Sequence, residues 1–494
     1  MSKNPIKQLV GETAIYGLST VLARVLNFFF VPLYTRMLST AHYGTVTEFM
    51  AYIAILQVVL TMGLETGCFR FANKHERPNE VFSSALSAVS VISLLFFVAC
   101  LLFAHPIAAG LGYAGFEKCI IYVGAILAID TFTSILFARL RFEHKAVTFA
   151  LFKTVKISGE LAFNLLLFLL LPSFLLRHPD SGITHFVSAT PDFSYVLFAI
   201  FLSCIVSLLL FIPSLAKKGA FRFRPILFQK MMLYSLPLML AGLPGILNDF
   251  GDRILFRFLI PAERVWQSDL GIFQAGVKLG VLMTLFTQMF RFAAEPFFFA
   301  QAKEQEGTAL YAKVLNYFTA FGMLIFLGVL LYIDVIGLII GPDFRAGISV
   351  TPVMLFAYLL LGMSFNVSMW YKLSEKTSYA LYITCAGLLM TLVVNIFFMP
   401  RFGYMAAAWA HLLSYAVILV VNVLLGRKYY PVPYNWKRIG CYIGAGLAIW
   451  AITHILPEMA LLTKWTLHTL LVLGYVAFVR ILERPSVKRR LSAN

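Results

Sequence analysis

Fourteen long apolar runs divide the sequence, and only short polar segments separate them. A helix needs about 20 apolar residues to cross the hydrocarbon core of a bilayer. An open sheet cannot satisfy its backbone hydrogen bonds in lipid, and the runs are too long and uniform for barrel strands. The sequence therefore predicts an all-α polytopic membrane protein with about 14 transmembrane helices. The predicted spans are residues 9–35, 45–68, 81–104, 117–138, 147–171, 193–215, 231–250, 269–292, 311–333, 349–370, 379–399, 403–425, 438–456 and 464–480.

The composition narrows the class of protein further. Of the 494 residues, 60% are hydrophobic and only 13% are charged, whereas soluble domains carry about 25% charged residues. A soluble enzyme, a disordered chain and a fibrous protein are thereby excluded. The six cysteines show no CxxC spacing, so we expect neither a metal site nor a disulfide framework. The first apolar run is too long for the core of a signal peptide, and we interpret it as the first span.

The net charge of +17 would suggest a nucleic-acid partner in a soluble protein. In a membrane protein, however, Lys and Arg concentrate in cytoplasmic loops. If fourteen spans place both termini on one side, 27 basic residues lie on that side, 9 lie on the other and 4 lie inside spans. This bias predicts cytoplasmic termini and no nucleic-acid partner.

The outer loops are short, the longest being residues 172–192, which leaves no room for the outer domain that a glycan polymerase or ligase would carry.

A weak internal repeat indicates two similarly oriented halves. Arg36-Met37-Leu38 precedes Tyr43-Gly44, and Arg257-Phe258-Leu259 precedes Leu270-Gly271. Six predicted helices separate the copies, so the repeat is parallel, as in two-lobed transporters. The predicted domains are residues 1–216 (a six-helix lobe), 217–428 (a second six-helix lobe) and 429–494 (two further helices and a basic tail).

Charges inside apolar spans are the most informative residues, because each is costly unless it faces a polar cavity or a partner. Arg24 lies in the middle of the first span, and Asn27 lies about one turn further along the same face. We interpret this pair as a cavity-lining cation and its neighbour, which would bind an anion. A structural ion pair with a carboxylate of another helix is the alternative.

The fifth span carries Lys153, Lys156 and Glu160, whose spacing of i, i+3 and i+7 places them on one stripe of a helix. The stripe predicts a polar surface that faces a central cavity. The alternative is that the two lysines extend toward the cytoplasmic interface while Glu160 pairs with one of them. Both interpretations stay open at the level of sequence.

The eighth span carries Gln274 and Lys278, which are four residues apart and share a face. We predict that both line the cavity. The deepest charges, Arg24, Lys156 and Lys278, are therefore cations on three different spans. A cavity lined by them would attract an anion, such as the pyrophosphate of a lipid-linked saccharide, whose lipid tail could stay in the bilayer.

The seventh span contains Pro237 and Pro244 and is followed by a charged segment with Asp252 and Arg253. Proline frees backbone carbonyls and permits bending of a membrane helix. These four residues are candidates for an outer gate. The alternative is an interfacial loop with local ion pairs, which we favour for Asp249 and Arg257.

Three carboxylates lie in or near spans: Glu48, Glu65 and Asp130. Any of them could bind a coupling cation. For Glu65 and Asp130 we favour a structural pair with Arg70 or Arg139. We expect Arg291 and Glu295, at the end of the eighth span, to form a surface pair.

Several short motifs resemble Wzx-type oligosaccharide-lipid flippases, the polysaccharide biosynthesis proteins of the multidrug/oligosaccharidyl-lipid/polysaccharide exporter superfamily. The resemblance extends over the first twelve predicted helices. The motifs that carry it are Pro32-Leu33-Tyr34-Thr35-Arg36-Met37-Leu38, His42-Tyr43-Gly44, Met62-Gly63-Leu64-Glu65-Thr66, Arg70-Phe71, Tyr234-Ser235-Leu236-Pro237-Leu238, Gly251-Asp252-Arg253-Ile254-Leu255, Leu270-Gly271-Ile272-Phe273 and Arg401-Phe402-Gly403-Tyr404.

The resemblance implies two six-helix lobes around a central cavity, with two extra C-terminal helices. It implies alternating access for undecaprenyl-pyrophosphate-linked oligosaccharide in the bacterial inner membrane, without catalysis, and Arg24 matches the cationic cavity residues of related flippases by position. Implied partners are this lipid-linked saccharide, membrane lipid and polysaccharide-assembly proteins. No cofactor is expected, and coupling to a proton or sodium gradient stays open. The alternatives are a lipid II flippase and a multidrug/cation antiporter of the same fold, although the antiporter would favour carboxylates as the main cavity charges.

Overall fold

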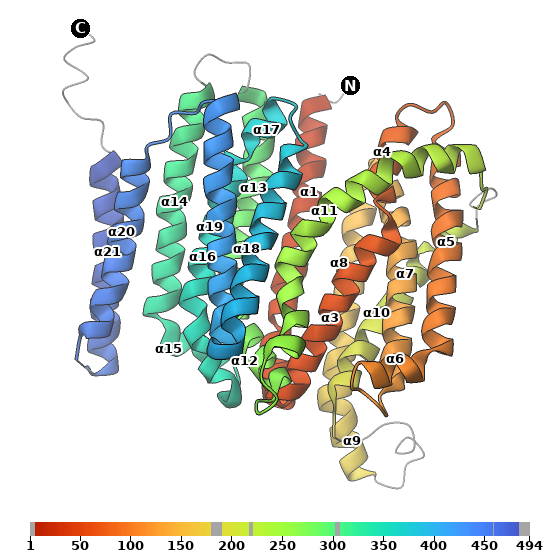
Figure 1. Cartoon of the computed structure of the whole chain (residues 1–494), viewed down its shortest axis with the longest axis horizontal. Coiled ribbons are helices and arrows are strands. Elements are labelled where there is room, and N and C mark those ends of the chain that lie inside the picture. Colours follow the sequence, from red (N-terminus) through yellow and green to blue (C-terminus); the bar gives the residue numbers. More distant parts are fainter. Residues whose placement is uncertain (1–4, 179–189, 217–220, 302–306, 458, 484–494) are drawn as a thin grey trace. The chain divides into compact units, whose positions relative to one another are not determined.

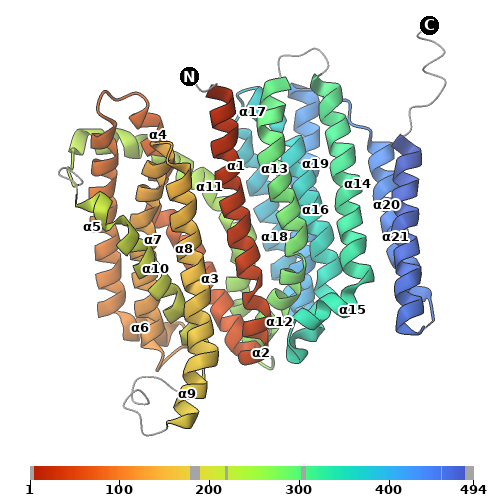
Figure 2. The same ribbon diagram turned by 180° about the vertical axis from the view of Figure 1, so that it is seen from behind.

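The computed structural model describes residues 5–178, 190–216, 221–301, 307–457 and 459–483 (Figures 1 and 2). Within these residues every regular element is helical. Thirteen helices are long and apolar enough to cross a membrane, and the number is fourteen if one bent helix pair is counted as a single span. The predicted all-α class and number of spans are confirmed for the described residues. The side on which the termini lie stays a prediction.

The described chain divides into two compact units, of which the first contains residues 1–274 together with 395–404. Helix α11 belongs to this unit because it packs on α3 and α4. The predicted division into lobes at residue 216 stays a prediction. The helices are α1 (Pro5–Phe28), α2 (Phe30–Met37), α3 (Thr40–Thr61), α4 (Leu64–Ala72), α5 (Pro78–Leu102), α6 (Ala104–Gly110), α7 (Glu117–Phe142), α8 (Ala146–Leu165), a π-helical turn (Leu166–Leu170), α9 (Leu171–Arg177), α10 (Phe193–Leu215), α11 (Pro225–Leu259) and most of α12 (Trp266–Leu279).

The second unit contains residues 275–394 and 405–494. Its apolar core is built around Phe318, Leu355 and Trp370, each of which is almost fully buried. Its helices are α13 (Val281–Gln301), α14 (Gly307–Leu331), α15 (Ile333–Ile336), two 3-10 helices (Gly337–Ile339 and Pro342–Val350), α16 (Thr351–Val367), α17 (Met369–Leu373), most of α18 (Tyr379–Phe402), α19 (Tyr404–Tyr429), α20 (Trp436–Ile455) and α21 (Leu461–Glu483).

The second predicted span is interrupted between α3 and α4. Met62 and Gly63 at the break both adopt left-handed backbone conformations, with φ of 51° and 67°. A Cβ atom on Gly63 would also lie 2.7 Å from the carbonyl oxygen of Ser235 in α11. Glycine is required at position 63 both by its backbone angle and by the close approach of α11.

The seventh span is longer than predicted. Helix α11 runs without interruption from Pro225 to Leu259, through both Pro237 and Pro244, and Figure 1 shows it curving along its length. The segment after residue 250, predicted to be a loop, continues the helix to Leu259. Its Arg257 pairs with Glu48 of α3, which ties this end of the helix to the first unit. Two prolines remove backbone donors and are a physical cause of the curvature.

The eighth span is bent by 49° between α12 and α13. Gly280 lies at the bend, and its backbone N–H donates to the carbonyl of Val277 rather than to that of Gly276. A tighter turn of this kind locally replaces the α-helical hydrogen-bonding pattern and changes the helix direction.

The glycines of the predicted repeat lie against each other inside the first unit. A Cβ atom on Gly44 of α3 would lie 1.8 Å from the carbonyl oxygen of Gln267 in α12. Reciprocally, a Cβ atom on Gly271 would lie 2.1 Å from the carbonyl oxygen of Thr40. The two helices therefore cross backbone to backbone, as small residues permit in membrane proteins. This reciprocal contact gives a physical reason for the repeated glycine.

Candidate functional site

A partly buried ion pair joins two helices of the first unit. Lys156 of α8 donates to a carboxylate oxygen of Asp130 in α7 over 2.5 Å, and the side chains are only 20% and 24% exposed. The thiol of Cys204, in α10, contacts the same oxygen at 3.3 Å. Burial of both charges is tolerated because each neutralises the other.

A second polar group continues this cluster along α8. Glu160 is half-buried one turn from Lys156. Asn164, a further turn along, donates from its amide to the carbonyl of Glu160 and accepts from the hydroxyl of Tyr34 in α2, each over 2.8 Å. We define Asp130, Lys156, Glu160 and Asn164 as the α7–α8 polar cluster. It carries one cation and two carboxylates.

The predicted stripe on α8 is therefore divided between two environments. Lys153 extends toward the rings of Phe137 and Phe149, with its ammonium nitrogen 5.3 and 5.8 Å from their centroids. Lys156 instead contacts Asp130. Lys156 therefore pairs with Asp130 of α7 and not with Glu160. Asp130 and Lys156 are 26 residues apart, so the helical spacing of the sequence does not indicate that they pair.

Arg24 and Asn27 both lie on the exposed face of α1. Helix α1 packs along α8, which carries the polar cluster. Both side chains therefore lie on the same face of α1, as their spacing of three residues predicts. Their role in substrate binding stays a prediction.

Gln274 and Lys278 differ in burial although they share a face of α12. Gln274 is 3% exposed and belongs to the first unit. Lys278 is half-buried and belongs to the second unit. Their assignment to a common cavity stays a prediction.

The gate candidates lie in the continuous helix α11. Pro237 is exposed and Pro244 is half-buried. Asp252 is 1% exposed, and the guanidinium of Arg253 lies 4.5 Å from the ring centroid of Phe250. Because Asp252 and Arg253 belong to a helix, the alternative of an interfacial loop is wrong for them. The role of the four residues in an outer gate stays a prediction.

A buried network at the end of α11 was missed by reasoning from sequence. Arg257 donates two hydrogen bonds to the carboxylate of Glu48 in α3, at 2.7 and 2.9 Å, and Glu48 is fully buried. Tyr113 and Tyr52 donate to the same carboxylate at 2.5 and 2.8 Å. The guanidinium also lies over the ring of Trp266, at 4.7 Å. We expected only local pairs for Arg257.

The signal that could have revealed this pair was the position of Glu48 inside an apolar span, because a buried carboxylate requires a cation. The sequence separation of 209 residues gave no indication which cation it was. The other predicted pairing was also wrong in its partner, since Glu65 accepts a hydrogen bond from Arg141 at 2.9 Å. Arg70 lies over Tyr234, and Arg139 pairs with Glu143.

The first unit thus holds its internal charges in pairs on several helices, with polar groups beside them. Within the described residues, no group of three His, Cys, Asp or Glu side chains is arranged to hold a metal ion. The paired charges lie within helices that are long and apolar enough to cross a membrane. The fold and these pairs define a polytopic helical membrane protein.

Comparison with known proteins assigns the family. The sequence pattern of the family described as "Polysaccharide biosynthesis protein" matches residues 9–301, more than half of the chain. The protein belongs to this family and is a multi-pass membrane protein. A relative in Haloferax volcanii, named as the probable low-salt glycan biosynthesis flippase Agl15, is 20% identical over 433 residues, which are 86% of this chain and 84% of the relative.

Solved structures share the fold. The lipid II flippase MurJ, in an inward closed conformation, matches with a TM-score of 0.70 and 14% identity over 95% of this chain and 100% of that chain. A multidrug resistance MATE family transporter of the MOP superfamily, in an inward-facing conformation, matches with a TM-score of 0.59 and 13% identity over 86% of this chain and 99% of that chain. The predicted family and fold are confirmed.

Proposed function

We propose that the protein moves an undecaprenyl-pyrophosphate-linked oligosaccharide from the cytoplasmic to the outer leaflet by alternating access. The cargo would serve the assembly of O-antigen, capsule or exopolysaccharide in the bacterial inner membrane. The observation that carries this proposal is the match to the polysaccharide biosynthesis family. The name of the Haloferax volcanii relative, a probable glycan biosynthesis flippase, points to the same class of cargo.

The physical requirement for such a cargo is compensation of its pyrophosphate charge within the membrane. An anion at the centre of a bilayer needs nearby cations or hydrogen-bond donors. Arg24 and Lys278 are the proposed cations, with Asn27, Lys153, Gln274 and Lys156 as polar neighbours. Lys156 is already neutralised by Asp130. Arg24 lies on the exposed face of α1 and is the cation of the first unit that we propose to test.

The shared fold does not choose the cargo, because lipid II flippases and multidrug transporters have it as well. Transport of lipid II and multidrug/cation antiport are the alternative functions. The family match favours a glycan cargo. Coupling to a proton or sodium gradient is part of the proposal, and the two carboxylates of the α7–α8 polar cluster are candidate groups for it.

A deletion strain tests the proposed function. We expect loss of a surface glycan and accumulation of its lipid-linked precursor, identified by mass spectrometry of extracted lipids. Accumulation of lipid II would instead assign the protein to cell-wall synthesis. An intact surface glycan with no accumulated precursor would contradict the proposed function.

Arg24→Ala tests the proposed cation in the same strain. The variant should insert normally and fail to restore the glycan, because the pyrophosphate loses its charge partner. Arg177→Ala, at a predicted outer loop, is the matched control and should restore it. Restoration by Arg24→Ala would remove Arg24 from the binding site.

A further inference from the structure

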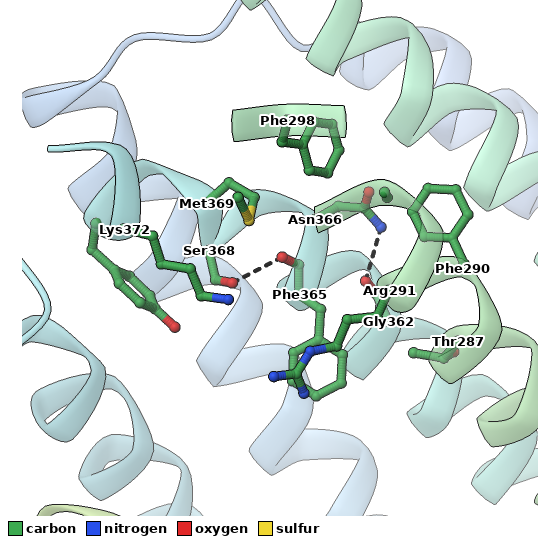
Figure 3. Close-up of a pocket in the computed structure, with 12 residues that line it drawn as sticks. Thr287, Phe290, Arg291, Phe298, Gly362, Phe365, Asn366, Ser368, Met369 and Lys372 are labelled. Atoms are coloured by element: carbon green, nitrogen blue, oxygen red, sulfur yellow. Dashed lines mark hydrogen bonds between the residues drawn. The ribbon is translucent and has the colours of Figure 1, made fainter. Parts of the chain in front are cut away.

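A small pocket lies inside the second unit, between α13 on one side and α16 and α17 on the other (Figure 3). Its volume is about 90 Å³, well above the roughly 10–15 Å³ that one water molecule requires and below the roughly 300 Å³ of small drug sites. Only part of a ligand, such as a headgroup, could enter it. We call it the α13–α17 pocket.

Two buried polar atoms of this pocket have no hydrogen-bond partner among the residues that the structure describes. They are the hydroxyl oxygen of Thr287 in α13 and the side-chain carbonyl oxygen of Asn366 in α16. The two residues are only 4% and 7% exposed, and both line the pocket. The amide nitrogen of Asn366 is already used, because it donates to the carbonyl of Gly362 over 3.1 Å.

Unsatisfied buried polar groups are costly and uncommon in native proteins, so each calls for an explanation. A ligand that presents both a hydrogen-bond acceptor and a hydroxyl or protonated oxygen would satisfy them. The Thr287 hydroxyl can donate to such a ligand, and the Asn366 carbonyl can accept from it.

The pocket also contains two cations. The guanidinium of Arg291 lies 5.0 Å from the ring centroid of Phe365, and Figure 3 shows it spread over that ring, with Lys372 reaching in from α17. No Asp or Glu is among the described residues that line the pocket. The cations of its described lining are Arg291 and Lys372. The expected pair of Arg291 with Glu295 lies outside the described residues, because the side chain of Glu295 is not among them.

The remaining walls are apolar. Phe290, Phe298 and Met369 line the same space. Gly362 keeps it open, because a Cβ atom there would lie 2.8 Å from the Thr287 hydroxyl and 2.4 Å from the ring of Phe318. Cations, one hydroxyl donor and aromatic walls together suit an anionic group attached to a hydrocarbon chain.

We propose that the α13–α17 pocket binds the phosphate group of a lipid. Arginine and lysine bind phosphate oxygens by charge-assisted hydrogen bonds, and the aromatic walls contact the first carbons of the lipid. By the predicted topology, this end of α13 and α16 faces the cytoplasm, where a lipid-linked saccharide is loaded. The proposal deepens the proposed function and rests on it for the identity of the cargo.

Two lipids carry the required chemistry: the isoprenyl pyrophosphate of the cargo and the phospholipids of the membrane. The probes are therefore farnesyl pyrophosphate, phosphatidylglycerol and inorganic pyrophosphate, titrated into the delipidated full chain and followed by native mass spectrometry. If the pocket variants weaken the binding of farnesyl pyrophosphate alone, the pocket binds the cargo. If they weaken the binding of phosphatidylglycerol alone, the pocket binds a membrane phospholipid.

The pocket variants are Arg291→Gln, Lys372→Gln and the nearly isosteric Thr287→Val. Each charge variant should weaken lipid-phosphate binding about tenfold, as expected for loss of one charge-assisted hydrogen bond. Thr287→Val should weaken it several-fold without changing the charge. Arg427→Gln and Lys313→Gln remove exposed cations outside the pocket and should leave the affinity unchanged.

Equal affinity of the pocket variants and the controls would overturn the proposal, as would the absence of binding by the wild type. Inorganic pyrophosphate binding as tightly as farnesyl pyrophosphate would overturn the requirement for a lipid. Elution volume and thermal unfolding identify any variant that fails to fold, and Thr287→Val keeps the test valid in that case. If the deletion strain keeps its glycan, the proposed function fails independently of these titrations.

Discussion

At the scale of single residues, the pair between Glu48 and Arg257 is the most deeply buried charge contact described above. Removal of one partner of a buried pair costs about 3–5 kcal/mol, because the other charge stays buried. An exposed pair contributes about 0–1 kcal/mol. The pair between Lys464 and Asp334 is of this second kind, with side chains 36% and 45% exposed.

We therefore expect Glu48→Gln to lower the thermal unfolding midpoint of the purified protein strongly, whereas Lys464→Gln should change it little. Fluorescence-monitored unfolding in detergent measures both. Equal shifts for the two variants would show that the contact of Glu48 with α11 contributes nothing special to stability.

The pair of Lys156 and Asp130 permits a test that separates structure from transport. Each single variant, Lys156→Gln or Asp130→Asn, leaves one buried charge and should destabilise the protein, and the double variant should regain stability. Thermal unfolding measures stability, and restoration of the surface glycan in the deletion strain measures transport. A stable but inactive double variant indicates substrate binding or coupling by these charges, and a stable active one indicates a structural pair.

Reasoning from sequence identified the costly charges but not their partners. Arg24, Lys156 and Glu48 stand out because the spans around them are almost free of charge. Lys156 pairs with Asp130, 26 residues away, and Glu48 pairs with Arg257, 209 residues away. Helical periodicity carries no information on which helices pack together. Thr287 and Asn366 could not be found in this way, because buried polar groups of that kind are common in membrane helices and only packing shows which lack a partner.

At the scale of elements, sequence placed the spans well and their ends less well. The apolar runs locate helices because a membrane helix must be long and apolar throughout. The polar segment after residue 250 was assigned to a loop, although it continues α11 to Leu259. Hydropathy predicts which segments are buried in lipid. It does not predict a polar helix that is stabilised by contacts with other helices of the protein.

The crossing of α3 and α12 predicts severe effects of small substitutions. Gly44→Ala and Gly271→Ala each place a methyl group about 2 Å from a carbonyl oxygen, so the helices must separate. Both should reduce the yield of folded protein and lower its unfolding midpoint. Gly440→Ala in α20, where a Cβ atom meets nothing within 4 Å, should be neutral or slightly stabilising, since alanine favours helices by about 1 kcal/mol over glycine.

Normal folding of both Gly44→Ala and Gly271→Ala would show that the backbones do not approach as closely as described. Size-exclusion chromatography of the detergent-solubilised protein distinguishes the outcomes. Because the contact is reciprocal, the two variants should have effects of similar size.

At the scale of the whole molecule, the orientation in the membrane rests on the distribution of basic residues. Cysteines at positions 177 and 222 test it, after replacement of the exposed native thiols Cys385 and Cys441. An impermeant thiol reagent added outside intact cells should label Arg177→Cys and not Arg222→Cys. The reverse pattern would invert the topology.

The reciprocal contact of Gly44 and Gly271 also has an evolutionary consequence. When a gene duplicates and fuses, equivalent residues of the two copies meet only close to the axis that relates the copies. The offset between these positions is 227 residues, and each glycine lies against the residue four positions before the other. A mutation at either position therefore has to be accommodated by the other copy, so the two halves cannot diverge independently at this point of the chain.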